Sequence, residues 1–308
     1  MIRVNPPAEV VSRGLIGARV QQPGTPTAPG SESRRMDRYA ALGCRAASMA
    51  LETAGRSRPN KGDPDWGIVL GSALGCWASN AEFLFDLDDR PTTELSPGLF
   101  VRTVANSVNG EIGIAHGLGG VNHTLVSGWS AGAEAVAEAA ALLSEGRARW
   151  VVTGGVESPD DVLRRAHAAA REEDGLEWLP ETIEEAAALC LLTARDSSSP
   201  TDRTRVTAYW RGRSPTGRWS LSTILGHSIG SVVVTNSIPP DLLRNWREQA
   251  GPRRLVYLPE EFGELGAAAA PFALADSRRF VGGPSGGDAI LLVARGIEGN
   301  VAALEVEA

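Results

Sequence analysis

Residues 128–132 read Gly-Trp-Ser-Ala-Gly, which is a Gly-x-Ser-x-Gly pattern. A serine in this pattern can lie on a sharp turn between a strand and a helix, where it attacks the acyl carbon of an ester or thioester. That chemistry also needs an acid and a histidine, and Asp160, His167 and His227 are available. Ser130 is therefore a candidate nucleophile for an acyltransferase or thioesterase. The structural alternative is that Ser130 caps the helix that follows it.

The chain has three cysteines, Cys44, Cys76 and Cys190, which lie far apart in the sequence. Zinc sites need ligands in closely spaced pairs, so we expect no metal. Cys76 has no base beside it and is expected to behave as a small apolar residue. Residues 282–287 (GGPSGG) lack the Lys-Ser/Thr of a phosphate-binding loop, so we interpret them as a hairpin turn and expect no cofactor.

The composition argues against several classes of protein. The 308 residues are 43% hydrophobic, enough for one large or two medium cores. A net charge of −7 argues against nucleic acid and anionic membranes as partners. No run approaches the ~18 apolar residues of a membrane span, and residues 1–7 do not begin a secretory signal. Together with the unpaired cysteines, these features lead us to expect a reduced, cytoplasmic protein.

Alternating strands and helices surround residues 128–132. The pattern predicts a strand at 125–127 that leads into the turn, a helix at 131–145 and a second strand at 150–153. This order predicts parallel strands covered by helices. The remaining segments predict helices at 34–55, within 160–180, at 240–250 and at 266–275, adjacent strands at 184–194 and 205–210, further strands at 66–72, 231–235, 289–295 and 302–306, and a loop at 21–33.

Residues 120–157 resemble the nucleophile-elbow region of β-ketoacyl synthases, which have the thiolase fold. The order of several further short segments makes the resemblance specific. It implies a layered α-β-α-β-α sandwich built from two related halves, 1–183 and 184–308, with the second half shortened. The further segments are 35–41, 96–100, 106–109, 117–120, 186–192 and 263–268.

The resemblance also implies that the family's catalytic positions are lost. Ketosynthases carry a reactive Cys at the elbow, and Trp129 stands there in this chain. Their two catalytic His residues correspond to Asn236 and Glu264, and the only lysine, Lys61, is far from the usual lysine position. An indole cannot form a thioester, and a glutamate opposes the negative charge that develops during condensation. Unaided condensation is therefore not expected.

Chain-length factors of polyketide synthases keep this fold without the Cys and typically carry Gln at the elbow. By the same logic we expect a non-catalytic subunit that pairs with an active ketosynthase in polyketide or fatty-acid-type biosynthesis. It would shape the pocket for an acyl chain held by an acyl carrier protein, with Trp129 filling space. His123, just before the elbow strand, is expected at the subunit interface. A serine-dependent enzyme using Ser130 and a silent structural homodimer remain the alternatives.

Overall fold

The computed structural model describes residues 1–17, 36–54, 59–173, 176–179, 181–194, 204–213, 219–225, 229–262, 264–281, 289–296 and 299–307. The predicted loop at 21–33, the predicted turn at 282–287 and His227 lie outside these residues. No helix in the described ranges is long and apolar enough to cross a membrane. Within the same ranges, no group of His, Cys, Asp and Glu side chains is arranged to hold a metal ion.

The described strands are β1 Ile2–Gly17, β2 Trp66–Gly71, β3 Asn122–Leu125, β4 Trp150–Glu157, β5 Ala186–Ala194, β6 Arg205–Arg213, β7 Ile229–Val234, β8 Arg254–Tyr257, β9 Ala289–Arg295 and β10 Asn300–Glu307. They form one ten-stranded sheet in the order β3-β2-β4-β5-β1-β6-β10-β9-β7-β8. The first five strands follow the order 3-2-4-5-1, and the last five, counted from the opposite edge, repeat it. The two halves meet where β1 pairs with β6 in antiparallel register. The repeat supports the prediction of two related halves. The predicted boundary at residue 184 stays a prediction, and on strand order we propose that the halves divide between β5 and β6.

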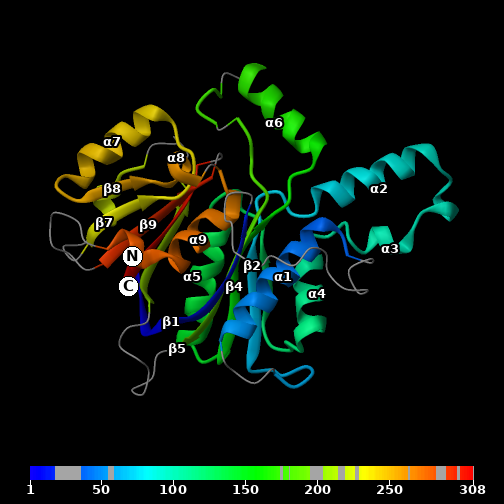
Figure 1. Cartoon of the computed structure of the whole chain (residues 1–308), viewed down its shortest axis with the longest axis horizontal. Coiled ribbons are helices and arrows are strands. Elements are labelled where there is room, and N and C mark those ends of the chain that lie inside the picture. The colour runs from blue at the N-terminus through cyan, green and yellow to red at the C-terminus, as the bar shows by residue number, and fades with distance from the viewer. Residues whose placement is uncertain are drawn as a thin grey trace.

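Helices pack in layers around this sheet (Figure 1). Helix α1 (Arg38–Thr53) covers the outer face of the first half and packs against α4 (Ser107–His116). Helices α5 (Ala131–Ser144) and α9 (Ala269–Ala275) contact each other and strands of both halves, so they form the middle layer. Helix α7 (Pro240–Ala250) packs its apolar face on the second half. This is the thiolase-like layered α/β architecture that the sequence predicts.

The remaining α-helices are α2 Trp77–Asp89, α3 Pro97–Phe100, α6 Asp161–Glu173 and α8 Leu258–Phe262. Short 3-10 turns are η2 Thr92–Glu94, η3 Leu221–Thr223, η4 Gly266–Ala268 and η5 Ser277–Phe280.

One strand lies where none is predicted, and two sequence predictions need correction. Strand β1 was not predicted, because Pro6 and Pro7 interrupt its pattern; they lie where its pairing with β6 shifts register. Strand β3 ends at Leu125, so the elbow strand lies earlier than the predicted 125–127. Strands β5 and β6 are not neighbours, since β1 lies between them.

Candidate functional site

The elbow turn is built by small residues at close approaches. Gly128 has a φ of +72°, a left-handed conformation that favours glycine. A Cβ on Gly132 would lie 1.8 Å from the carbonyl oxygen of Ala267, so glycine lets the start of α5 pack directly on η4. The chain therefore presents Trp129 between the end of β3 and the start of α5, next to the turn that follows Glu264.

Trp129 is only 3% exposed. Its side chain belongs to a small apolar cluster with Leu179 and Ile183, and the partly buried Leu74 packs against the same cluster. An indole in this position occupies the space at the elbow turn with packed carbon surface. Trp129 thus contributes bulk to the interior and offers no nucleophile.

The structure brings Asn236 and Glu264 together. The Nδ2 atom of Asn236 donates to Oε1 of Glu264 at 3.0 Å and to the carbonyl oxygen of Gly266 at 2.8 Å. Its Oδ1 atom accepts from the hydroxyl of Thr235. Both donors of the amide are therefore in use, and none remains to polarise a thioester carbonyl.

Glu264 is likewise held by its neighbours. Its Oε2 atom accepts from the backbone N–H of Ser237 at 2.7 Å, and its Oε1 atom accepts from that of Gly266 at 2.9 Å. The side chain is fully buried, and burial raises its pKa against the opposing effect of these donors. The backbone carbonyl oxygen of Glu264 accepts from the N–H of Glu184. Glu184 follows Ile183, which packs in the same apolar cluster as Trp129. The three positions thus lie in one closed, connected region.

Glu157 is a further carboxyl in this region, and it is not among the site residues predicted from the sequence. It is fully buried and accepts from the backbone N–H groups of Ala73, Leu74 and Ala267. The carboxyl thereby ties the turn after β2 to η4. An acidic residue ending the otherwise apolar stretch of β4 is the sequence signal that points to it. Burial raises the pKa of Glu157 to about 7.

We expect Glu157 to make stability depend on pH. Its folded-state pKa of about 7 exceeds the usual 4.5, so the native state binds the proton more tightly between these values. The stabilisation is complete below pH 4.5 and is lost as pH rises through 7. Glu157→Gln should flatten this fall in urea-unfolding free energy, whereas a Gln at the exposed Glu145 should leave it intact. Parallel curves for Glu157→Gln and wild type would contradict the assignment.

Ser130 does not lie in the setting of a reactive serine. It is fully buried, and its hydroxyl donates to Oε1 of Glu134 at 2.7 Å and contacts the carbonyl oxygen of Ser127. It occupies the N-cap position of α5 but makes no side-chain capping bond there, unlike the expected cap. Asp160 instead accepts from the N–H of Leu163 at the start of α6.

The three thiols are free cysteines. Cys76 is buried before α2, where the amide of Asn80 contacts its sulfur at 3.5 Å. Burial raises its pKa and keeps the thiol protonated. This setting agrees with the expected role as a small apolar residue.

Fold and site together define a thiolase-like protein in which Trp129 packs in an apolar cluster at the elbow while Asn236 and Glu264 bond to each other. The chain belongs to the β-ketoacyl synthase family: the family model for the beta-ketoacyl synthase N-terminal domain matches residues 15–171.

Curated relatives match part of the chain. A 3-oxoacyl-[acyl-carrier-protein] synthase 2 from Rhizobium meliloti is 32% identical over 129 residues, covering 42% of this chain and 31% of that protein. A protein of the same name from Vibrio harveyi is 26% identical over 135 residues, covering 44% and 32%. The matched part therefore spans about a third of the length of these relatives.

Solved structures match the whole chain at low identity. A type II polyketide synthase acyl-carrier protein in complex with its ketosynthase (AntDE:AntF) gives a TM-score of 0.79 at 15% identity, covering 100% of both chains. The ishigamide ketosynthase/chain length factor gives 0.72 at 18%, covering 98% and 99%. The ketosynthase ApeO with its chain length factor ApeC, from Xenorhabdus doucetiae, gives 0.69 at 13%, covering 98% of each. At these identities the likeness establishes the fold.

Proposed function

We propose that this chain is a non-catalytic, chain-length-factor-like subunit that pairs with an active ketosynthase and shapes its acyl pocket. The observation that carries the proposal is the burial and bonding of the three side chains that the resemblance assigns to the family's catalytic positions. Trp129 fills the elbow, and both donors of the Asn236 amide are bound to Glu264 and Gly266. A chain with this fold and a closed site still offers a scaffold and a surface for a catalytic partner.

The free edge of the sheet supports pairing. Among the described strands β3 is bonded to β2 alone, so its other edge is open. An open edge can accept a strand from a second chain. Two apolar side chains are exposed close to it in sequence: Val126 directly follows β3, and Ile114 of α4 is 81% exposed. Helix α4 also contacts both β2 and β3.

The segment 77–106, here called the arm, adds a second apolar surface. It contains α2 and α3, which project away from the sheet in Figure 1. Phe85 is 64% exposed and Val101 is 67% exposed, and Leu84 and Phe100 are also exposed. Exposed apolar clusters of this kind mark protein interaction sites.

The charge of the arm favours a partner that is not a second copy. Segment 77–106 holds five acidic residues and two arginines, a net charge of −3. A two-fold homodimer places the same patch on both sides of the interface, so acidic arms close to the axis would repel. A distinct subunit can offer apolar and basic groups instead. Two of the similar structures contain a chain length factor, by their descriptions, and this supports the choice of partner.

Co-expression with an active ketosynthase tests this proposal. We expect a stable heterodimer, and we expect Phe85→Glu and Val126→Glu to weaken it by about tenfold or more in Kd, equivalent to about 1.4 kcal/mol. Val281→Glu, a matched change at an exposed valine of the second half, should leave the affinity unchanged. A monodisperse homodimer that ignores the ketosynthase would contradict the proposal.

A further inference from the structure

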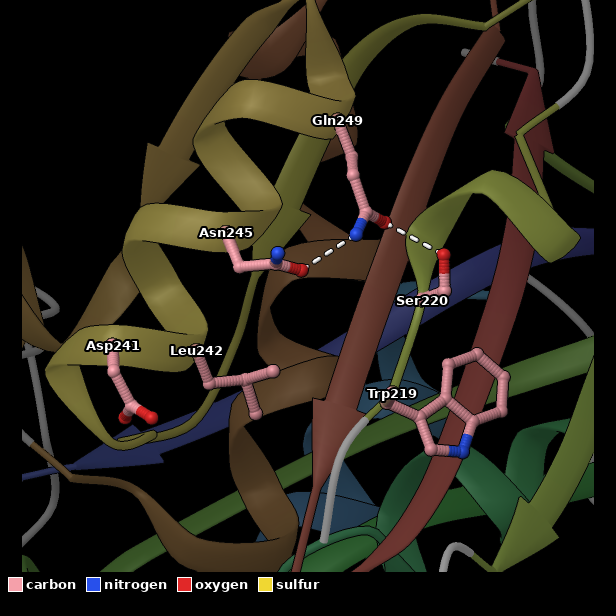
Figure 2. A pocket seen from close by; sticks show the side chains of 6 residues that line it. All are labelled: Trp219, Ser220, Asp241, Leu242, Asn245 and Gln249. Atoms are coloured by element: carbon pink, nitrogen blue, oxygen red, sulfur yellow. Dashed lines mark hydrogen bonds between the residues drawn. The ribbon is translucent and has the colours of Figure 1, made fainter.

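A cavity of about 350 Å³ lies on the outer side of the second half, away from the elbow. It opens between α7 and the chain just before η3 (Figure 2). Its volume is at the lower end of the range for small-molecule sites. None of the positions discussed at the elbow lines it. The lining residues are Trp219, Ser220, Asp241, Leu242, Asn245 and Gln249.

One face of α7 supplies the polar groups. Asp241, Asn245 and Gln249 are spaced by four residues, so they lie one helical turn apart along the cavity. The Oε1 atom of Gln249 accepts from the Ser220 hydroxyl at 3.0 Å, and its Nε2 atom donates to Oδ1 of Asn245. These bonds fix both amides and direct Nδ2 of Asn245 away from Gln249 (Figure 2).

Two groups in this row keep hydrogen-bonding capacity. Within the described part of the chain, the Asp241 carboxylate and Nδ2 of Asn245 form no hydrogen bond to another side chain. One offers acceptors and the other offers donors, about one helical turn of ~5.4 Å apart. A ligand that can both donate and accept over this distance matches them.

The apolar side of the cavity is rigid. Trp219 packs edge-on against Trp210, with ring centroids 3.9 Å apart. Its carbonyl oxygen accepts from the indole N–H of the fully buried Trp246 at 2.8 Å. Trp219 and Leu242 line the cavity beside the polar row.

A second charge lies near Asp241. Arg295, at the end of β9, is buried; burial lowers its pKa, and the charge of Asp241 opposes that shift. The two charges therefore attract each other, and Arg295 offsets part of the charge at this end of the cavity. A hydroxylated ligand can both donate to Asp241 and accept from Asn245, whereas an ammonium group offers donors alone, so the lining favours the hydroxylated ligand.

We propose that this cavity is a binding site for a small neutral polyhydroxylated ligand of the sugar class. The apolar face of the ligand would lie on Trp219 and Leu242. Its hydroxyls would donate to Asp241 and accept from Asn245. The site is separate from the proposed pairing surface, so it can be tested on this chain alone.

Saturation-transfer NMR with methyl glycosides of glucose, galactose and mannose tests the site, with putrescine as the cationic probe. We expect ring-proton signals from at least one glycoside and a loss of affinity of about tenfold or more in Asp241→Asn and Asn245→Ala. Both positions are exposed, so the variants should fold. Glu248→Gln, on the same helix outside the lining, is the matched control and should bind like wild type. Binding of putrescine alone, or of no probe, would overturn the proposal.

Discussion

Replacing Trp129 with alanine is expected to destabilise the fold by about 3–5 kcal/mol. The indole is buried against Leu179 and Ile183, so its removal leaves a cavity that the surrounding chain cannot fully close. Equilibrium unfolding in urea measures the change. Trp77→Ala removes an exposed indole and should cost far less.

The outcome for Trp129→Ala separates two interpretations of the elbow. A loss close to that of Trp77→Ala would mean that Trp129 does not support the interior. The elbow would then behave as an open pocket, and the proposal that Trp129 fills it would be wrong.

Removal of the Glu264 side chain is expected to have the second large effect. Glu264→Ala leaves three buried donors without an acceptor: the N–H groups of Ser237 and Gly266, and one N–H of Asn236. Each unpaired buried group costs about 1–3 kcal/mol, so we expect a loss of about 3–5 kcal/mol in unfolding free energy. Thermal unfolding measures it.

Two further variants control this prediction. Glu264→Gln keeps an acceptor oxygen and the shape of the side chain, so it should lose less than the alanine variant. Glu260→Ala removes an exposed carboxylate four residues earlier and should change stability little. If Glu264→Ala were as mild as Glu260→Ala, the buried network would not hold the site closed.

Most of the architecture follows from local sequence pattern. Helix α5 and strand β4 lie where apolar periodicity predicts them, and α7 begins with proline at a position that favours helix starts. Strand β1 was missed because its two prolines break the alternation that marks a strand. Its place between the halves depends on pairing with segments almost 200 residues away, which no local pattern contains.

The resemblance predicts which residues form the candidate site, but it does not predict how their side chains are bonded. That Trp129, Asn236 and Glu264 stand at the family's catalytic positions stays a prediction from the resemblance, and the structure brings the last two into contact. The amide of Asn236 bonds to the carboxylate of a residue 28 positions away in the sequence. No local sequence pattern predicts this bond, so it became known only from the structure. Glu157 was overlooked as a functional group for a similar reason: its partners follow β2 and α8, far from it in sequence.

The most direct test of the central claim is the intact mass of each chain in the co-purified complex after incubation with a short acyl thioester. We expect an acyl adduct on the ketosynthase and an unchanged mass for this chain. An adduct on this chain that disappears in Ser130→Ala would contradict the account and make the chain an acyltransferase or hydrolase.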